Sequence, residues 1–164
     1  AEKAAPEILV SILAGTCIEK LSAKFGTRLD YGDEELYAFP TPEQLCRANT
    51  EDIHSCGAGY RDVYIKKTAE AFASGEFDTD KLYSLPYKEA KSYLVSLSGI
   101  GEKVADCILL FGAHRFEAFP VDTWIIKSMK SLYGMEKPAD IRRFAAEHFG
   151  ENAGFAQQIL FAAS

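Results

Sequence analysis

The segment "LSGIGEKVADCILLFG", residues 97–112, decides how this chain folds. Two glycines, Gly99 and Gly101, separate one apolar helix pattern from the next. A connection this short between two helices requires residues that are free of a Cβ clash, so the segment predicts a tight helical hairpin with both glycines in the turn. Ile100 between them is expected to point into the core and fix the hairpin.

Lys103 stands where the second helix of this hairpin begins. Gly101 leaves the first N–H groups of that helix uncovered, and together with the helix dipole they form a site that suits phosphate. A cation at this end is disfavoured by about 0.3–1 kcal/mol. The same field, together with burial, lowers the pKa of a lysine, and a partly neutral amine is a nucleophile suited to Schiff-base chemistry. A plain capped turn and an exposed lysine that tolerates its position remain alternatives.

Asp122 follows in "AFPVDTW", residues 118–124, where Pro120 fixes the approach to another helix. The position suits an N-cap, and a cap alone would explain the residue. A carboxylate held rigidly near Lys103 could also stabilise a cationic intermediate and help to deprotonate the amine. Nineteen residues separate the two side chains, about one helix and a turn, so a hairpin-like return would bring them to one cleft.

The rest of the chain is dominated by helix patterns. Thr41 and Gln44 form a capping-box pattern with Pro42 in the first turn. Strand patterns are nearly absent, because no alternating run is longer than about four residues. We therefore predict an all-α, two-lobed helical bundle of roughly eight short helices, with a cleft between the lobes. Helices are predicted within residues 1–13, 17–26, 41–48, 60–74, 86–97, 102–112, 119–134, 138–150 and 154–164.

Length and charge limit the function classes that remain. The 164 residues predict a single helical domain, with one lobe near 27–118 and the other formed by 1–26 plus 119–164. We expect no membrane span and no secretion signal. The net charge of -6 argues against coating nucleic acid by bulk charge, but it allows a few phosphate contacts through backbone N–H groups.

The four cysteines do not form a metal-binding pattern. Their positions are widely separated and include no Cys-x-x-Cys pair, which argues against zinc and iron–sulfur sites. We expect reduced thiols in an intracellular protein, in the cytoplasm, nucleoid or nucleus. The cysteines are Cys17, Cys46, Cys56 and Cys107.

Taken together, the glycine turn, Lys103 and the Pro-Val-Asp segment resemble a known family. The run of residues 97–124 is similar to the helix-hairpin-helix plus Gly/Pro-Asp superfamily of DNA glycosylases, and most similar to its 8-oxoguanine DNA glycosylase/AP lyase branch. The "GAGYRDVYI" segment (57–65), the "YAFPTPEQL" segment (37–45) and the "GFAQQILFAAS" segment (154–164) extend the match to residues 18–164.

The resemblance implies catalytic roles for two residues. Lys103 would attack the sugar C1′, displace an oxidised purine from duplex DNA and form a Schiff base, which permits β-elimination of the strand. Asp122 would be the aspartate of the family motif. No cofactor would be required for catalysis, although a monovalent cation on the hairpin carbonyls would help to hold phosphate. The partner would be double-stranded DNA containing a damaged purine, bound by a monomer.

The resemblance also implies a base pocket and DNA contacts. Cys107 and Phe161 would lie against the two faces of the extruded base, and Gln157 would bond to its Watson–Crick edge. Without the family, each has an ordinary alternative: a core position for Cys107 and Phe161, and a solvated helix position for Gln157. The predicted DNA-binding residues are Tyr60 and Arg61 near the duplex gap, and Gly99 and Gly101 at a phosphate.

Some features of the branch have no counterpart here. Its larger members carry a β-rich domain before the helices, which contributes to lesion recognition, and an asparagine-rich stretch between the first two helices. The sequence leaves open whether this chain is a piece of a longer protein or has lost those contacts. Ser98 replaces a frequent proline of the hairpin. The lack of a four-cysteine cluster after the helices argues against the endonuclease III and adenine-glycosylase branches.

Three hypotheses therefore remain. The first is a bifunctional glycosylase with AP lyase activity on oxidised purine. The second is a truncated or degenerate helix-hairpin-helix module that grips phosphate without catalysis. The third is an interaction domain in which Lys103 and Asp122 are structural.

Overall fold

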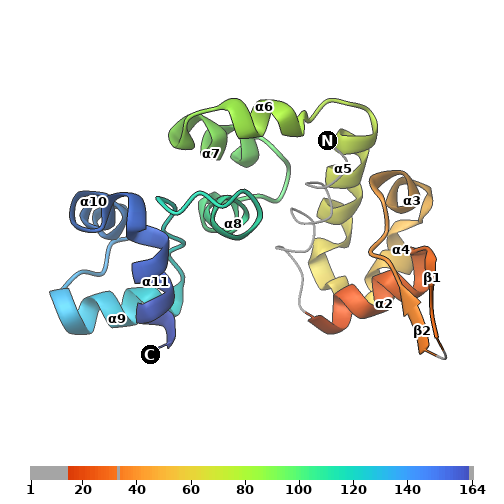
Figure 1. Ribbon diagram of the computed structural model, residues 1–164, viewed down its shortest axis with the longest axis horizontal. Helices are drawn as coiled ribbons and strands as arrows, with labels where there is room; N and C mark the ends of the chain where they lie inside the picture. The colour runs from red at the N-terminus through yellow and green to blue at the C-terminus, as the bar shows by residue number, and fades with distance from the viewer. Residues whose placement is uncertain (1–14, 33, 163–164) are drawn as a thin grey trace. The chain divides into compact units, whose positions relative to one another are not determined.

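The computed structural model describes residues 15–32 and 34–162. Within this part, the chain divides into two compact units (Figure 1). The first contains the residues up to Ser84 together with 96–99, and the second contains 85–95 and the residues from Ile100 onward. The helix predicted within 1–13 lies outside the described residues. Helices dominate both units, which confirms the all-α class.

The first unit has an apolar core to which four of its helices, α2 to α5, contribute. Leu21 of α2, Leu45 of α3, Ile53 of α4 and Ile65 of α5 are all buried in that core. The sequence grouped residues 1–26 with the C-terminal helices, whereas the described part of that segment belongs to this unit. The predicted cleft between lobes stays a prediction. The helices are α2 (Gly15–Phe25), α3 (Pro42–Arg47), α4 (Thr50–Ile53), α5 (Asp62–Ala73) and α6 (Thr79–Ser84).

The predicted capping box at the start of α3 is confirmed. Thr41 Oγ1 accepts a hydrogen bond from the Gln44 N–H at 3.3 Å, and Gln44 Oε1 accepts one from the Thr41 N–H at 2.8 Å. Pro42 occupies the first turn, where its missing N–H costs nothing. These residues fix where α3 begins, and α3 in turn packs against α5.

A small β-hairpin is present that the sequence did not predict. Strands β1 (Arg28–Tyr31) and β2 (Glu34–Tyr37) pair antiparallel, with Arg28 opposite Tyr37. Each strand has only four residues, so its pattern was too short to recognise. Gly26 before β1 is required by close packing, because a Cβ there would lie 1.9 Å from the Ala38 carbonyl oxygen.

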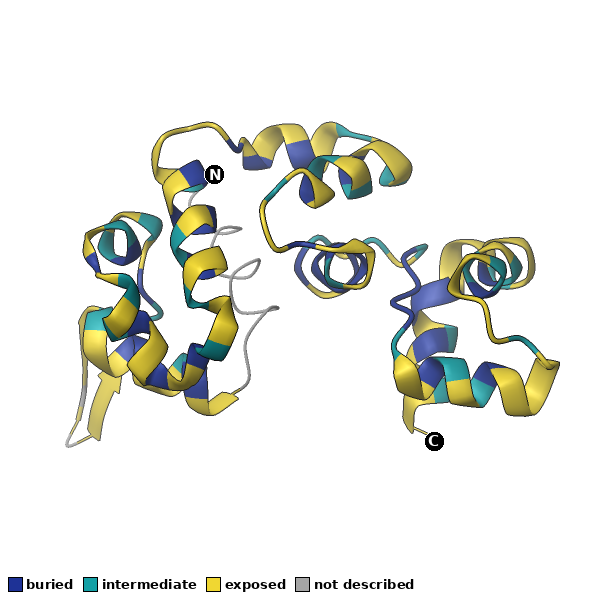
Figure 2. Ribbon diagram, turned by 180° about the vertical axis from the view of Figure 1, so that it is seen from behind, coloured by how far each residue is buried: buried dark blue, intermediate teal, exposed yellow. Residues whose placement is uncertain are grey.

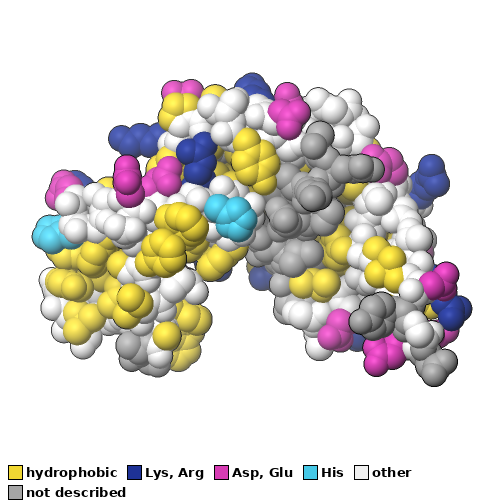
Figure 3. Space-filling model, viewed as in Figure 1, with side chains coloured by type: hydrophobic (Ala, Val, Ile, Leu, Met, Phe, Trp, Pro, Cys, Tyr) yellow, Lys and Arg dark blue, Asp and Glu magenta, His cyan; other side chains and the backbone are white. Residues whose placement is uncertain are grey.

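The second unit has its own core under the C-terminal helices. Figure 2 shows buried residues along these helices, and the core includes Ile125 and Met129 of α9 and Ile141 and Ala145 of α10. On the face drawn in Figure 3, exposed hydrophobic side chains gather over α9 and α11. The helices are α7 (Tyr87–Val95), α8 (Glu102–Cys107) with a π-helical continuation η3 (Ile108–Gly112), α9 (Thr123–Tyr133), α10 (Pro138–His148) and α11 (Ala153–Ala162).

The predicted hairpin joins α7 to α8. Ile100 is buried, as expected, with 4% of its surface exposed. Gly99 has φ +88°, and a Cβ there would lie 2.3 Å from the ring of Tyr64. The sequence also predicted that a Cβ would clash at Gly101, and this is wrong. Gly101 has an extended backbone with φ -90° and open space around the Cβ position. Only one of the two glycines is therefore required sterically.

No helix among the described residues is long and apolar enough to cross a membrane.

Candidate active site

A pocket of about 230 Å³ in the second unit collects all five predicted catalytic and base-pocket residues. They come from three places in the sequence: α8, the turn before α9, and α11. The pocket thus joins segments that are far apart along the chain. It is lined by Lys103, Cys107, Phe111, Pro120, Asp122, Gln157, Gln158 and Phe161.

Lys103 is the second residue of α8 and lies at this pocket. It is exposed, so the expectation of a buried amine is wrong. Gly101 caps the helix without a side-chain hydrogen bond, as the sequence predicts. Of the described residues that line the pocket, Lys103 is the one cation and Asp122 the one carboxylate. The described lining of the pocket therefore carries one charge of each sign.

Asp122 is the N-cap of α9, and it also lines the pocket. Its Oδ1 accepts a hydrogen bond from the Ile125 N–H at 2.8 Å. The two interpretations of this residue, cap and pocket carboxylate, are therefore compatible. The cap bond fixes the orientation of the carboxylate, because a staggered side chain with one oxygen held has little freedom left.

Cys107 lies one turn beyond Lys103 and is 9% exposed. Burial raises the pKa of its thiol, while the charge and hydrogen bond of Lys103 lower it in part. The thiol is therefore neutral at neutral pH. A neutral, polarizable sulfur beside Lys103 offers an apolar contact surface and no competing charge.

Gln157 is buried, with 4% of its surface exposed, so the alternative of a solvated helix residue is wrong. Its Nε2 donates to the Pro120 carbonyl at 3.3 Å, and its Oε1 accepts from Gln158 Nε2 at 2.5 Å. A carbonyl can only accept, so the amide nitrogen must face Pro120. One N–H and one lone pair of the Gln157 amide remain for a ligand.

Two aromatic side chains complete the pocket. Phe161 is 47% exposed and Phe111 is 52% exposed, which removes the core alternative for Phe161. Exposed rings beside a pocket suit stacking on a planar ligand. The sequence analysis missed Phe111 and Gln158. The spacing Lys103, Cys107 and Phe111, four residues apart each time, could have revealed the first.

The predicted DNA-binding residues are not part of this pocket. Tyr60 is 72% exposed, and the Arg61 guanidinium lies over its ring at 4.6 Å. Both belong to the first unit, in the turn before α5, where Gly57 and Gly59 have positive φ. Their roles at DNA, like those of Gly99 and Gly101, stay predictions.

The described residues contain no group of three or more histidine, cysteine or acidic side chains that could hold a metal ion. The predicted monovalent cation would instead bind backbone carbonyls of the hairpin. The Gly101 carbonyl already accepts from the Ala105 N–H at 2.9 Å. A carbonyl oxygen has two lone pairs, so one remains on Gly101, and the cation stays a prediction.

A buried polar network anchors α8 from the other side, and the sequence analysis missed it. Asp106 is fully buried, and its carboxylate accepts from the Tyr87 hydroxyl at 2.6 Å and from Lys91 Nζ at 2.8 Å. Burial raises the pKa of Asp106, and the hydrogen bonds from Lys91 and Tyr87 counteract it in part. The network ties α8 to α7, and thereby holds Lys103 and Cys107 in place.

A helical hairpin followed by a lysine and a capped Pro-Val-Asp aspartate at one pocket defines the helix-hairpin-helix class of DNA repair proteins. The chain belongs to the HhH-GPD superfamily of base excision DNA repair proteins, whose family model matches residues 12–150.

Similar curated proteins carry the name N-glycosylase/DNA lyase. The chain is 33% identical to a protein of Methanothermobacter thermautotrophicus named "Probable N-glycosylase/DNA lyase", over 94% of this chain and 58% of that protein. It is 30% identical to the N-glycosylase/DNA lyase of Saccharomyces cerevisiae, over 86% of this chain and 47% of the relative. The chain therefore spans about half the length of these curated relatives.

A solved structure shows the same fold. The 8-oxoguanine glycosylase/lyase of Clostridium acetobutylicum, in complex with double-stranded DNA containing cytosine opposite 8-oxoguanine, is 40% identical, with a TM-score of 0.89. The match covers 96% of this chain and 59% of that one.

Proposed function

We propose that the chain carries the active site of a base excision DNA glycosylase with AP lyase activity, which removes 8-oxoguanine from duplex DNA. The observation that carries the proposal is the single pocket in which Lys103 and Asp122 meet Cys107, Gln157 and Phe161. Relatives named N-glycosylase/DNA lyase support it. An intracellular location, predicted from the sequence, agrees with a DNA substrate.

The base would be held by contacts that need no charge. An extruded purine costs a few kcal/mol of lost stacking, which a pocket must replace. Phe161 offers an exposed ring for one face, and the neutral Cys107 thiol offers a contact for the other. The free N–H and lone pair of Gln157 can bond to the base edge, because Pro120 and Gln158 already fix the orientation of the amide.

The chemistry would begin with the Lys103 amine. Its lone pair attacks C1′ of the sugar, the bond from C1′ to the base breaks, and the base leaves with a proton. The sugar ring then opens to give a protonated Schiff base between C1′ and Nζ. Loss of a proton from C2′ expels the 3′ phosphate by β-elimination, and water finally hydrolyses the Schiff base.

Asp122 would act through its charge. One oxygen is held by the Ile125 N–H, so the carboxylate is already oriented when positive charge develops on the sugar. Preorganised charge of this kind lowers the barrier without reorganisation during the reaction. The same carboxylate can accept the proton that Lys103 must lose before attack.

Sodium borohydride trapping tests the proposal, because it reduces a Schiff base to a stable covalent adduct. We expect an adduct with duplex DNA that contains 8-oxoguanine opposite cytosine, and none after Lys103→Gln. Lys137→Gln, an exposed lysine at the start of α10 and outside the pocket, is the matched control and should trap like the parent. Salt-sensitive duplex binding without an adduct would instead support a non-catalytic DNA-binding module.

A further inference from the structure

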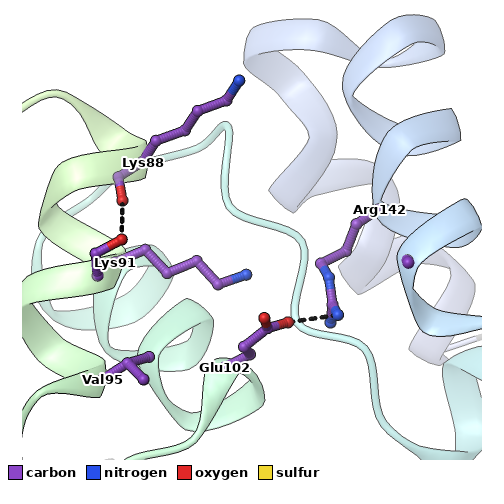
Figure 4. A pocket seen from close by; sticks show the side chains of 7 residues that line it. Lys88, Lys91, Val95, Glu102 and Arg142 are labelled. Carbon is purple, nitrogen blue, oxygen red and sulfur yellow. Dashed lines mark hydrogen bonds and ion pairs between the residues drawn. The ribbon is translucent and has the colours of Figure 1, made fainter.

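A second pocket of the second unit lies between α7, the start of α8 and α10 (Figure 4). Its volume is about 530 Å³, within the range of roughly 300–1,000 Å³ that is usual for ligand sites. Among the described residues, it shares no lining residue with the pocket of Lys103. It is lined by Lys88, Lys91, Ser92, Val95, Glu102, Ala139 and Arg142.

Helix periodicity places two lysines on the same wall of this pocket. Lys88, Lys91, Ser92 and Val95 stand at spacings of three, four and seven residues, so they share one face of α7. Figure 4 shows Lys91 reaching from α7 toward Glu102 and Arg142. Its Nζ donates to buried Asp106 at 2.8 Å, which fixes the ammonium group at the pocket wall. An ammonium group has three N–H donors, so this bond does not exhaust it.

The opposite wall carries an ion pair between Arg142 of α10 and Glu102 of α8. Their side chains are 27% and 57% exposed. A guanidinium has five N–H donors in a planar fork, and one carboxylate leaves several of them available. Among the described residues, the amine of Lys88 has no bonding partner. Three cations and one carboxylate therefore line the pocket, and the carboxylate of Asp106 lies behind its wall on Lys91, in a chain whose 24 acidic residues outnumber its 18 basic ones.

We propose that this pocket binds the phosphate group of a nucleotide unit, at a site separate from the base pocket. Phosphate oxygens match the N–H donors of Lys88, Lys91 and Arg142. Asp106 pairs with Lys91 and Glu102 pairs with Arg142, so the uncompensated charge that favours an anion is that of Lys88. Val95 and Ala139 supply apolar contact for a sugar or base carried by that phosphate. Glu102 opposes the anion and limits its affinity.

The phosphate could belong to a DNA strand or to a free nucleotide, so the test has two arms. The first arm measures binding of an undamaged duplex by fluorescence anisotropy at several salt concentrations. The second measures binding of deoxyguanosine monophosphate by calorimetry. Neither arm requires base excision. The proposal of a phosphate site can therefore be wrong while the proposed glycosylase function is right, and the proposed function can be wrong while the phosphate site exists.

Three variants are compared with the parent protein in each of the two binding measurements. Lys88→Gln should weaken binding about fivefold in one arm, the order expected of one partly exposed ion pair. In the duplex arm, Lys88→Gln should also lower by about one the slope of the logarithm of the binding constant against the logarithm of the salt concentration. Glu102→Gln should strengthen binding in the same arm, because it removes the opposing charge and releases Arg142. Lys137→Gln removes an exposed lysine outside the pocket, and is the control for bulk charge.

The outcomes identify the source of the phosphate. A selective effect of Lys88→Gln on the duplex assigns the pocket to the DNA strand, and a selective effect on the monophosphate assigns it to a free nucleotide. The proposal is overturned if Lys88→Gln matches Lys137→Gln in both arms, or if Glu102→Gln leaves the affinity unchanged.

Discussion

The two faces of α8 differ in how their side chains are held. On the pocket face, Lys103 is exposed and Cys107 is the one partner described for its side chain, through the weak hydrogen bond of a thiol. On the buried face, Asp106 accepts two short hydrogen bonds, one of them from an ammonium group. The helix is thus anchored strongly on one side, whereas the Lys103 amine on the other side has few bonds.

The largest expected effect on activity is on the pocket side of this comparison. Asp122→Asn should slow base release on the order of 10²- to 10³-fold, because a preorganised charge is lost where positive charge develops. Folding should hardly change, because asparagine caps a helix as well as aspartate does. Single-turnover rates on 8-oxoguanine duplex and urea unfolding measure the two effects. A loss of stability as large as the loss of rate would mean that Asp122 is mainly a cap.

The buried face should respond in the opposite way. Lys91→Met keeps most of the side-chain volume but leaves the Asp106 carboxylate without its cation, which should cost about 3–5 kcal/mol of unfolding free energy. Lys88→Met, one turn earlier on α7 and exposed, is the matched control and should cost less than about 0.5 kcal/mol. Adding Asp106→Asn to Lys91→Met should recover part of the loss.

The pH dependence of the Lys91→Met deficit sharpens this test. Burial already raises the pKa of Asp106, and loss of Lys91 raises it further. The folded state then binds more protons than the unfolded state above the ordinary carboxyl pKa, so stability falls as the pH rises through that window. Urea unfolding should therefore show a larger deficit at pH 7 than near pH 4. A deficit that is constant with pH would exclude Asp106 as its cause.

The contrast between the pocket face and the buried face of α8 also explains which features the sequence could predict. Lys103, Asp122 and the glycine turn follow each other at short, recognisable spacings, and the helices around them show clear periodicity and caps. Asp106 was missed because an aspartate inside a helix usually faces solvent, and its partners Tyr87 and Lys91 lie on another helix. The β-hairpin was missed because its strands are short and mostly exposed. Contacts between distant segments leave no local signal.

Substitutions in the turn between α7 and α8 should have a smaller effect on stability. Gly101 serves there as the control for Gly99. Gly99→Ala should cost about 2–4 kcal/mol, because the backbone has φ +88° and the new methyl would overlap the Tyr64 ring. Gly101→Ala should cost less than about 1 kcal/mol, because its backbone is extended and its surroundings are open. Thermal unfolding of the two variants measures the difference. Equal costs would contradict the steric distinction between these glycines.

The smallest effect concerns how the base is recognised. Gln157→Ala should reduce the preference for an 8-oxoguanine duplex over an abasic duplex, because only the 8-oxoguanine duplex offers a base edge to the amide. Gln158→Ala leaves Gln157 in place but removes the bond to its Oε1, so it should lower the same preference by a few-fold. Competition binding with the 8-oxoguanine and abasic duplexes measures both effects. If abasic and lesion duplexes suffer alike in the Gln157 variant, the amide does not contact a base. If the Gln158 variant matches the parent, the bond from Pro120 alone is enough to orient that amide.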